Sequence, residues 1–522
     1  MTSQGADDAA TAEADGGSSF VEYGIEDEPP LSTSVLLGVQ HYLTMVGANI
    51  AVPLILAGAM GMPAEVTAKF VGTFFVVSGI ATLAQTTFGN RYPIVQGAPF
   101  SMLAPALAIV ATAPALPGSA PWESKLLFLQ GAIIAAAVTE VFIGYLGIVG
   151  RLRRLLSPVV VAPTIALIGL SLFNVPQITS ATQNWWLLGL TVGLVVLFSQ
   201  YLGDGHRVFQ LFPVLLAIVI AWVVAAVLSV TGVYVDGTPG YVDLAAVTDV
   251  SLVFAIYPLQ WGMPQFEAAF AIGMFAGVLA SIIESFGDYH AVARLTGTGA
   301  PSESRINHGI GMEGLMNVFA GIMGAGGSTS YSENIGAIGL TGVASRRVVQ
   351  AGAAVMLVVG FFGPFGQLVA TIPNPIVGGL FVAMFGQIVA VGLSNLKYVD
   401  LDSSRNVFVI GIALFTGLSI PRYMTNVGGV EAFAEGLASV PVLGGALTAL
   451  TDVPVLGLVL GIDTVANTLF VIGGTGMAVG GLIALVLDNT IPGTDEERGV
   501  EAWEDITEDE SDFSPVWSSA DD

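Results

Sequence analysis

The sequence contains no cysteine and few charged residues. Without Cys in 522 residues, a disulfide framework, a thiol nucleophile and a thiolate metal site are all excluded. Charged residues make up 11% of the chain and hydrophobic residues 54%, whereas soluble domains carry about 25% charged residues. Such a chain lacks the polar surface that a soluble protein needs. The composition therefore predicts an integral membrane protein and excludes disordered, fibrous and nucleic-acid-binding proteins.

Basic residues are scarce as well, and the acidic excess is concentrated at the two ends of the chain. Fifteen Lys and Arg stand against 40 Asp and Glu, which gives a formal net charge of −25. Residues 1–30 contain eight acids and no Lys or Arg, and residues 493–522 contain twelve acids and Arg498. Such runs are typical of solvated, disordered tails. The acidic exposed stretches favour a halophilic protein from a salt-rich cytoplasm.

Apolar stretches long enough to cross a bilayer recur along the chain. A helix needs about 20 apolar residues to span the hydrocarbon core. The sequence offers fourteen candidates, namely 34–57, 68–87, 94–111, 126–149, 155–174, 185–203, 208–232, 268–289, 308–325, 327–342, 347–371, 375–394, 405–421 and 465–488. With the N-terminus inside, twelve Lys and Arg fall on inner connections and three on outer ones, as the positive-inside rule requires. The sequence therefore predicts fourteen spans in the cell membrane with both termini cytoplasmic, and the acidic outer stretches 233–265 and 423–462 as surface connections.

Two of these candidates are unsuited to contact with lipid. The third span and its flank contain Pro93, Pro99 and Pro105, and the tenth begins with the polar run 326–334, GGSTSYSEN. Irregular backbone at membrane depth requires surrounding protein or a water-filled cavity. The two segments occupy the same place in two sets of seven spans, and an odd-numbered repeat must be inverted in the membrane. Paired interruptions of this kind point to a transporter binding site, while re-entrant loops of purely structural purpose are the alternative.

Acidic side chains at membrane depth are few. Glu284 and Asp288 are four residues apart and therefore share one face of span eight. Glu313 lies early in span nine, and Glu333 lies in the polar break of span ten. A buried carboxylate is costly unless it is paired, protonated or ligated, and none of these acids has an evident Lys or Arg partner within a span. They are either neutral structural acids or groups that meet a substrate and a coupling ion, and their clustering beside the broken span favours the second reading.

Other ionisable residues within spans are less informative. Glu140 in span four has no acidic neighbourhood in the sequence and is interpreted as structural or cavity-lining. His41 follows Gln40 in span one and is either a packing histidine or a site residue. The remaining histidines lie near span ends without HExxH or comparable spacing. Neither a membrane enzyme nor a resident metal or cofactor is therefore expected, and a channel would need a continuous polar stripe.

The residue types at the two broken spans favour a small planar heterocycle as the substrate. Backbone N–H groups at half-helix N-termini donate to carbonyl or anionic oxygens. Glu284 and Glu333, when ionised, only accept hydrogen bonds and therefore suit N–H groups of a ligand. Phe100, next to Pro99, offers a flat apolar face for a ring. A nucleobase satisfies all three conditions, whereas two acceptor-only acids would repel sulfate, bicarbonate or a fully ionised ascorbate.

Four motifs resemble one known family. The run 333–342, ENIGAIGLTG, is similar to the signature of the nucleobase–ascorbate transporter family, also called nucleobase:cation symporter-2. That signature has an acid, amide or Pro, then Asn, then Gly two positions later and Thr five positions after that Gly. The runs 284–288 (ESFGD), 40–41 (QH) and 96–97 (QG) with Phe100 resemble the family's motifs in spans eight, one and three. The resemblance runs from about residue 31 to Gly493 and leaves only the tails outside.

The resemblance implies a fold. It indicates an all-α polytopic membrane protein with 14 transmembrane spans, built from seven-plus-seven inverted repeats with short antiparallel β-strands in spans three and ten. A core domain is expected over 31–150 (spans one to four) and 266–372 (spans eight to eleven). A gate domain is expected over 151–265 (spans five to seven) and 373–492 (spans twelve to fourteen), with disordered tails at 1–30 and 493–522. The family likeness also implies a homodimer and elevator-like alternating access.

The resemblance also assigns roles to individual residues. Glu284 is expected to grip two substrate N–H groups, and Glu333 to contact the base from the opposite side. Asp288 falls where the bacterial uracil permease has a His linked to proton coupling and where xanthine-type members carry Asp. The implied substrate-binding set is Glu284, Glu333, Phe100 for ring stacking, Ser332 through its backbone amide, and His41. The implied coupling and support set is Asp288, Glu313, Asn334 (expected to orient Glu333), Gln96 and Thr341.

The motifs divide over the substrate. Glu333 matches uracil-type members, whereas xanthine types have Gln and ascorbate types have Pro at that position. The runs 345–350, 392–396 and 487–493 instead resemble the animal branch, which includes sodium–ascorbate carriers. Because those runs flank helices, the site residue decides, and we expect symport of a nucleobase, either uracil or a related base such as xanthine or urate, with H⁺ or Na⁺. Sodium-coupled ascorbate transport and anion exchange on the same architecture are the alternatives.

Overall fold

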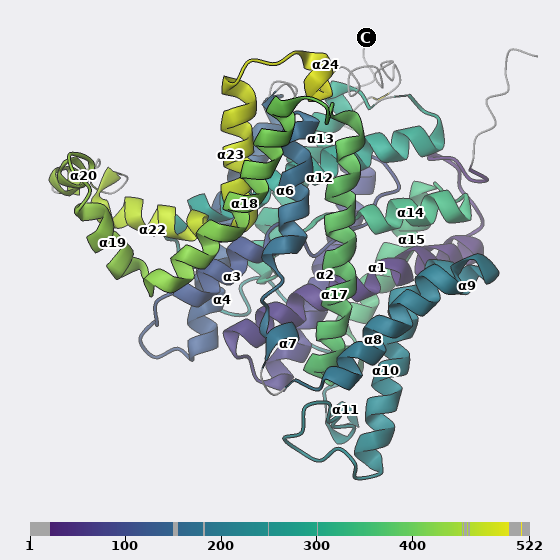
Figure 1. Cartoon of the computed structure of the whole chain (residues 1–522). Coiled ribbons are helices and arrows are strands. Elements are labelled where there is room, and N and C mark those ends of the chain that lie inside the picture. The colour runs from purple at the N-terminus through teal and green to yellow at the C-terminus, as the bar shows by residue number, and fades with distance from the viewer. Residues whose placement is uncertain are drawn as a thin grey trace, which may run out of the picture.

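The computed structural model describes residues 21–149, 155–180, 183–248, 250–299, 301–451, 453, 457, 460–500 and 513. These residues are mostly helical, and two two-residue strands are the only strands among them (Figure 1). Every predicted span contains a helix. In order these are α1 (Leu31–Met60), α2 (Ala64–Phe88), α3 (Leu103–Thr112), α4 (Pro121–Tyr145), α6 (Pro158–Ser171), α8 (Trp185–Val196), α10 (Pro213–Val230), α12 (Ala268–Thr296), α13 (Glu303–Met323), α14 (Ser332–Thr341), α15 (Arg346–Phe361) with α16 (Gly363–Ala370), α17 (Asn374–Ser394), α18 (Ser404–Val427), and α22 (Ile462–Gly473) with α23 (Gly476–Thr490).

Many of these helices are long and apolar enough to cross a membrane. Among the described residues seven pass on length and composition, or up to nine if each of two bent pairs counts as one span. Shorter apolar helices, α3, α6 and α8 with its π-helical extension Leu197–Tyr201, lie between them. The protein is therefore a multi-pass membrane protein, and the count of fourteen spans stays a prediction.

The helices pack in two groups. In one group α4 packs against α12 and α13, and α15 packs against both α1 and α2. In the other group α6 packs against α17 and α23, and α18 packs against α23. Figure 1 shows α6 and α17 side by side along their length. The division into a core domain and a gate domain, and relative motion between them, stay predictions.

The expected strands are present in the third and tenth spans. β1 (Gln96–Gly97) pairs antiparallel with β2 (Thr329–Ser330), with Gln96 opposite Ser330 and Gly97 opposite Thr329. All four residues are buried, and each strand is followed by a ten-residue helix, α3 and α14 respectively. The pairing satisfies backbone groups that lipid could not. This is the geometry that two inverted repeats would produce, although the repeat itself stays a prediction.

The outer stretch 423–462 differs from the expected surface connection. It contains α19 (Val430–Ala438) and α20 (Leu443–Thr451), which are bent by 114° and are together apolar enough for a broken span or re-entrant loop. Figure 1 shows this pair projecting from the side of the bundle. The acidic character of this stretch, with Glu431 and Glu435, favoured a loop. In the structure both acids are exposed on α19, and most of the other residues of that helix are apolar. The last span is also broken, because α22 and α23 meet at 96°.

Parts of both predicted tails are ordered. Tyr23 bridges Val343, and Glu28 pairs with Arg347 at 2.9 Å, so that residues 21–30 lie against the segment between α14 and α15. At the other end, the short helix α24 (Asp495–Arg498) brings Arg498 within 2.8 Å of the buried carboxylate of Asp488. Local composition suggested disorder, but acids of the first tail form ion pairs with basic residues at the start of α15. Residues 1–20 and most of 501–522 lie outside the described residues.

Gly38 on α1 and Gly352 on α15 bring two helices into backbone contact. A Cβ added at Gly352 would lie 2.5 Å from the carbonyl oxygen of Gly38. Small residues allow such close approach in membranes. We expect Gly352→Ala to force the helices apart and to cost about 1–3 kcal/mol, seen as a lower Tm in detergent. The control Gly411→Ala in α18, where an added methyl meets no atom within 4 Å, should leave Tm unchanged or slightly higher. Equal melting of both variants would contradict the close contact.

Candidate functional site

A cavity of about 580 Å³ lies between the two groups of helices. One wall comes from the first group and carries Phe100, Glu284, Asp288 and Ser332, and the other wall comes from α6, α17 and the 3₁₀ turn η3 (Asn395–Tyr398). The structure therefore brings together four residues that the sequence had marked in three separate segments. The volume is within the range of roughly 300–1,000 Å³ that is usual for small-molecule sites.

Asp288 is held by two serine hydroxyls. Its Oδ1 accepts a hydrogen bond from Ser332 Oγ at 2.6 Å, and its Oδ2 accepts one from Ser330 Oγ at 2.7 Å. Ser330 belongs to β2 and Ser332 is the first residue of α14. Hydrogen bonds of this kind offset the cost of burying a carboxylate. The carboxylate therefore ties α12 to the point where the tenth span changes from strand to helix.

Glu313 on α13 is fully enclosed by hydroxyl donors and does not line the cavity. Its Oε1 accepts hydrogen bonds from Ser281 and Thr329, at 2.7 and 2.9 Å, and its Oε2 accepts one from Ser285 at 2.6 Å. Ser285 Oγ also lies 2.9 Å from Ser330 Oγ. The hydrogen-bond networks of Glu313 and Asp288 are thus joined through α12 and β2, which supports the assignment of Glu313 to a supporting position.

The sequence had not marked the hydroxyl groups that hold these acids. Ser281 and Ser285 are four residues apart on α12 and share one helix face, which is a signal that could have been noticed. Thr329 and Ser330 lie in the polar run that was marked only for its polarity. Which hydroxyl meets which carboxylate depends on the packing of three separate segments.

His41 and Asn334 form a buried pair behind the strands. His41 does not line the cavity, and its Nδ1 lies 2.9 Å from Asn334 Nδ2. Asn334 Oδ1 accepts a hydrogen bond from the backbone N–H of Val95, just before β1, at 2.9 Å. The sequence had placed His41 among the substrate contacts and had expected Asn334 to orient Glu333. In the structure both side chains are buried and the pair secures the start of β1, while the expected roles of His41 in substrate binding and of Asn334 in orienting Glu333 stay predictions.

The remaining marked residues take different positions. The backbone N–H of Gln96 donates a hydrogen bond to Thr82 Oγ1 at 2.9 Å, and the side chain of Gln96 is buried. Thr341 ends α14, and its hydroxyl donates to the carbonyl oxygen of Ala337 at 2.8 Å, away from the cavity. Glu333 belongs to the first turn of α14, but its side chain lies outside what the structure describes.

Two features of the cavity wall suit a planar polar ligand. Phe100 meets Phe385 of α17 edge to face, with ring centroids 6.0 Å apart, so an aromatic ring from the broken span faces the opposite wall. The N-terminus of α14 opens at Ser332, and no side chain caps it. Its first backbone N–H groups therefore resemble the half-helix ends that bind carbonyl or anionic oxygens. Among the described residues no group of three or more His, Cys, Asp or Glu is arranged to hold a metal ion.

The fold resembles those of two solved membrane proteins. It superposes on the transmembrane domain of a cyanobacterium bicarbonate transporter, BicA, with a TM-score of 0.51 at 17% sequence identity, covering 75% of this chain and all of that one. It also superposes on murine Solute Carrier 26 family member A9, an anion transporter, with a TM-score of 0.52 at 12% identity, covering 80% of this chain and 69% of the other. At these identities the likeness shows the fold alone.

Sequence comparison identifies the family. Residues 32–426 match the profile of a family described as the permease family. The chain is 42% identical over 525 residues to Solute carrier family 23 member 2 of Homo sapiens, covering 92% of this chain and 76% of the relative. It is 35% identical over 519 residues to Nucleobase-ascorbate transporter 12 of Arabidopsis thaliana, covering 93% and 72%. The chain belongs to the nucleobase–ascorbate transporter family, and it is a transporter rather than an enzyme.

Asn334 offers a test of how the strands are held. We expect Asn334→Ala to leave the buried N–H of Val95 and the ring of His41 without their partner, at a cost of about 1–3 kcal/mol for a buried group left unsatisfied. The measurement is Tm of the purified protein in detergent. Asn426→Ala, at an exposed position near the end of α18, is the matched control and should leave Tm unchanged. Equal Tm values for the two variants would show that the buried pair does not secure β1.

Proposed function

We propose that this protein imports a nucleobase across the cell membrane by cation symport, with uracil or a related base as the substrate and with both termini in the cytoplasm. The observation that carries the proposal is the composition of the cavity wall. Glu284 supplies an acceptor for ring N–H groups, the N-terminus of α14 supplies donors for carbonyl oxygens, and Phe100 supplies an apolar ring. A base presents N–H and C=O groups on one flat edge and therefore matches all three.

Asp288 is the proposed site of cation coupling. It lines the cavity and is bound by Ser330 and Ser332, which belong to β2 and α14. A proton or Na⁺ on this carboxylate would change which hydrogen bonds the two serines can make. Binding of the cation would thus alter the same segment whose N-terminus faces the substrate.

The position of the cavity supports alternating access. Its two walls belong to the two groups of helices, and one end reaches Arg294, Lys397 and Tyr398. Arg294 Nη1 on α12 donates to the hydroxyl of Tyr398 on η3 at 3.2 Å, which is a contact between the groups. On the proposed topology these residues lie on the cytoplasmic side, so this contact joins the two groups at the cytoplasmic end of the cavity. We further propose elevator-like movement of the group that carries α12 and α14, within a homodimer.

Sodium-coupled transport of ascorbate is the second candidate. Arg294 and Lys397 at one end of the cavity would attract an anionic substrate. The Arabidopsis relative is a nucleobase-ascorbate transporter by name. Glu284, as an acceptor inside the cavity, favours a ligand with N–H groups, and the nucleobase therefore comes first.

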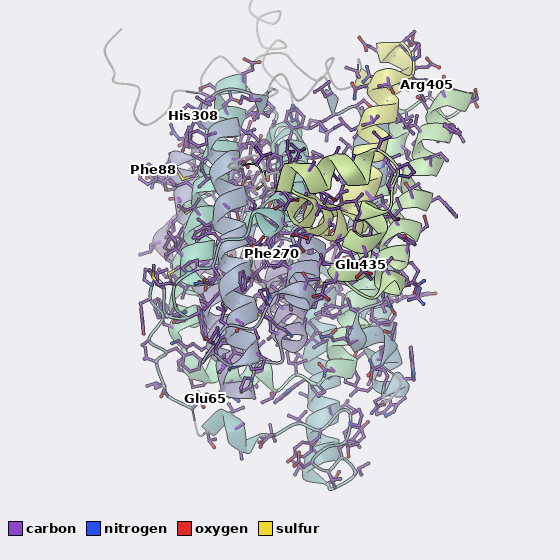
Figure 2. All side chains as sticks on the ribbon, turned by 90° about the vertical axis from the view of Figure 1, so that its left-hand side faces the viewer. Glu65, Phe88, Phe270, His308, Arg405 and Glu435 are labelled. Atoms are coloured by element: carbon purple, nitrogen blue, oxygen red, sulfur yellow. The ribbon has the colours of Figure 1, made fainter. Side chains whose placement is uncertain are left out.

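Uptake into proteoliposomes tests the substrate and the role of Glu284 together. We expect gradient-driven, saturable uptake of labelled uracil, inhibited by unlabelled bases but not by ascorbate. Glu284→Gln should lower affinity about 10–100-fold, because an amide N–H would meet the ring N–H where an acceptor is needed, and hydrogen bonds to charged groups contribute about 1.5–3 kcal/mol. The control is Glu435→Gln on α19, an exposed position visible in Figure 2. Inhibition by ascorbate alone would favour the second candidate, and unchanged affinity in Glu284→Gln would exclude the proposed contact.

Asp288 can be tested separately from substrate binding. Asp288→Asn keeps an acceptor oxygen for one serine but removes the charge that a cation would neutralise. We expect base binding, measured on purified protein, to persist within about tenfold, while accumulation against a gradient is lost. Counterflow exchange of base without a cation gradient serves as the internal control for folding and access. Active accumulation at the wild-type level in this variant would refute the coupling role.

A further inference from the structure

Glu140 on α4 is an acid for which the proposed transport site has no use. Its side chain is completely buried, and its Oε2 accepts a hydrogen bond from Asn317 Nδ2 at 2.9 Å. Its Oε1 is buried without a hydrogen-bond partner among the described residues. None of the ion pairs among the described residues includes it. A carboxylate in this setting is not stable as a bare anion and requires either a proton or another cation.

Asn317 connects Glu140 with the strand at the transport site. Asn317 Oδ1 accepts a hydrogen bond from the backbone N–H of Ser328 at 2.6 Å. Ser328 immediately precedes β2, whose Thr329 donates to Glu313 and whose Ser330 donates to Asp288. A continuous polar path therefore leads from the carboxylate of Glu140, through one amide and one strand, to the carboxylate that lines the cavity. Ser328 Oγ, beside this path, is likewise buried without a partner among the described residues.

The charged and titratable surroundings of Glu140 are all acidic or neutral in the described part of the protein. Glu313 lies on α13 four residues before Asn317, on the same face of that helix, and Tyr289 lies on α12, which also packs against α4. Arg305 on the same helix as Glu313 is engaged elsewhere, where its Nη1 donates to the carbonyl oxygen of Asn90 at 2.7 Å. Two carboxylates that influence one another in a low-dielectric interior resist simultaneous ionisation. Removing a cation from one of them therefore changes the affinity of the other for a cation.

We propose that Glu140 is a second binding carboxylate for a small monovalent cation, a proton or Na⁺, and that Asn317 transmits its occupancy to β2. This inference deepens the proposed symport function and rests on it for the part that concerns coupling. When the cation leaves, Glu140 carries a full negative charge and attracts the side-chain amide of Asn317 more strongly. Asn317 also accepts the hydrogen bond from the N–H of Ser328, just before β2, and Ser330 of β2 donates to Asp288. If Glu140 had only a structural role, it would need only an oxygen that accepts the hydrogen bond from Asn317. Glutamine supplies that oxygen but cannot bind the cation, so Glu140→Gln separates the two roles.

The first experiment does not depend on any substrate. Purified protein in nanodiscs is melted across pH, and across NaCl with choline chloride replacing it at constant ionic strength, for wild type, Glu140→Gln and Glu65→Gln. Glu65 is exposed in the first turn of α2 and carries a matched substitution (Figure 2). If the cation is a proton, the wild-type Tm falls as pH rises through the titration of the buried carboxyl group, and Glu140→Gln removes that fall. If the cation is Na⁺, NaCl raises the wild-type Tm and Glu140→Gln removes the rise.

If Tm depended on pH and on Na⁺ in the same way in wild type and in Glu140→Gln, the proposal would be overturned. If Glu140→Gln does not fold, Glu140→Asp provides the test, because it keeps the carboxyl group one methylene further from Asn317. A shifted midpoint in the pH or Na⁺ titration then supports the site, and an unshifted midpoint overturns it.

The second experiment measures coupling. Reversal potentials in proteoliposomes give the number of cations per base, and we expect Glu140→Gln to transport one fewer than wild type and Glu65→Gln. An unchanged ratio would show that the cation at Glu140 is not transported and would refute the coupling part. Failure of wild type to accumulate any base would refute the proposed function, while the melting experiment would still decide whether Glu140 binds a cation.

Discussion

The structure around the cavity depends on the hydrogen bonds that stabilise two buried carboxylates at membrane depth. Asp288 and Glu313 are bound by hydroxyl groups, and two of the donors, Ser330 and Thr329, are adjacent in β2. Asp288 lies on α12 and Glu313 on α13, so two consecutive residues of β2 bind acids on two different helices at the break in the tenth span. The break exposes backbone groups, and pairing with β1 satisfies them. The interruptions in the third and tenth spans therefore satisfy one another's backbone groups.

The same interaction links the substrate cavity to the rest of the bundle. β2 is followed directly by α14, whose N-terminus faces the cavity, and α12 carries both Glu284 and the residues that meet β2. Asn334 and His41 secure the start of β1 from behind, and Asn317 secures the residue before β2. These three side chains thus act on the same pair of short strands.

Much of the site could be predicted from the sequence, because its chemistry is unusual for a membrane segment. Glu284, Asp288, Phe100 and Ser332 attracted attention as polar or aromatic residues beside helix breaks, and all four line one cavity. His41 attracted attention because it follows Gln40 in span one, but its side chain is buried away from the cavity, since the direction in which a helical residue points depends on the helices packed against it. Glu140 seemed isolated because its neighbours are distant in sequence: Asn317 comes from α13 and Glu313 from the same helix.

The amino-acid sequence alone determined that the chain lies in a membrane, in which segments most of its apolar helices lie, and that two spans must be interrupted. Those properties follow from local composition, because apolar length, proline and clustered polar residues act within a single segment. Tertiary structure decided the partners: which hydroxyl meets which carboxylate, that residues 21–30 pack against the bundle, and that residues 430–451 form a bent helical pair. Those choices depend on contacts between segments far apart in the chain, and they become definite only when the helices pack together.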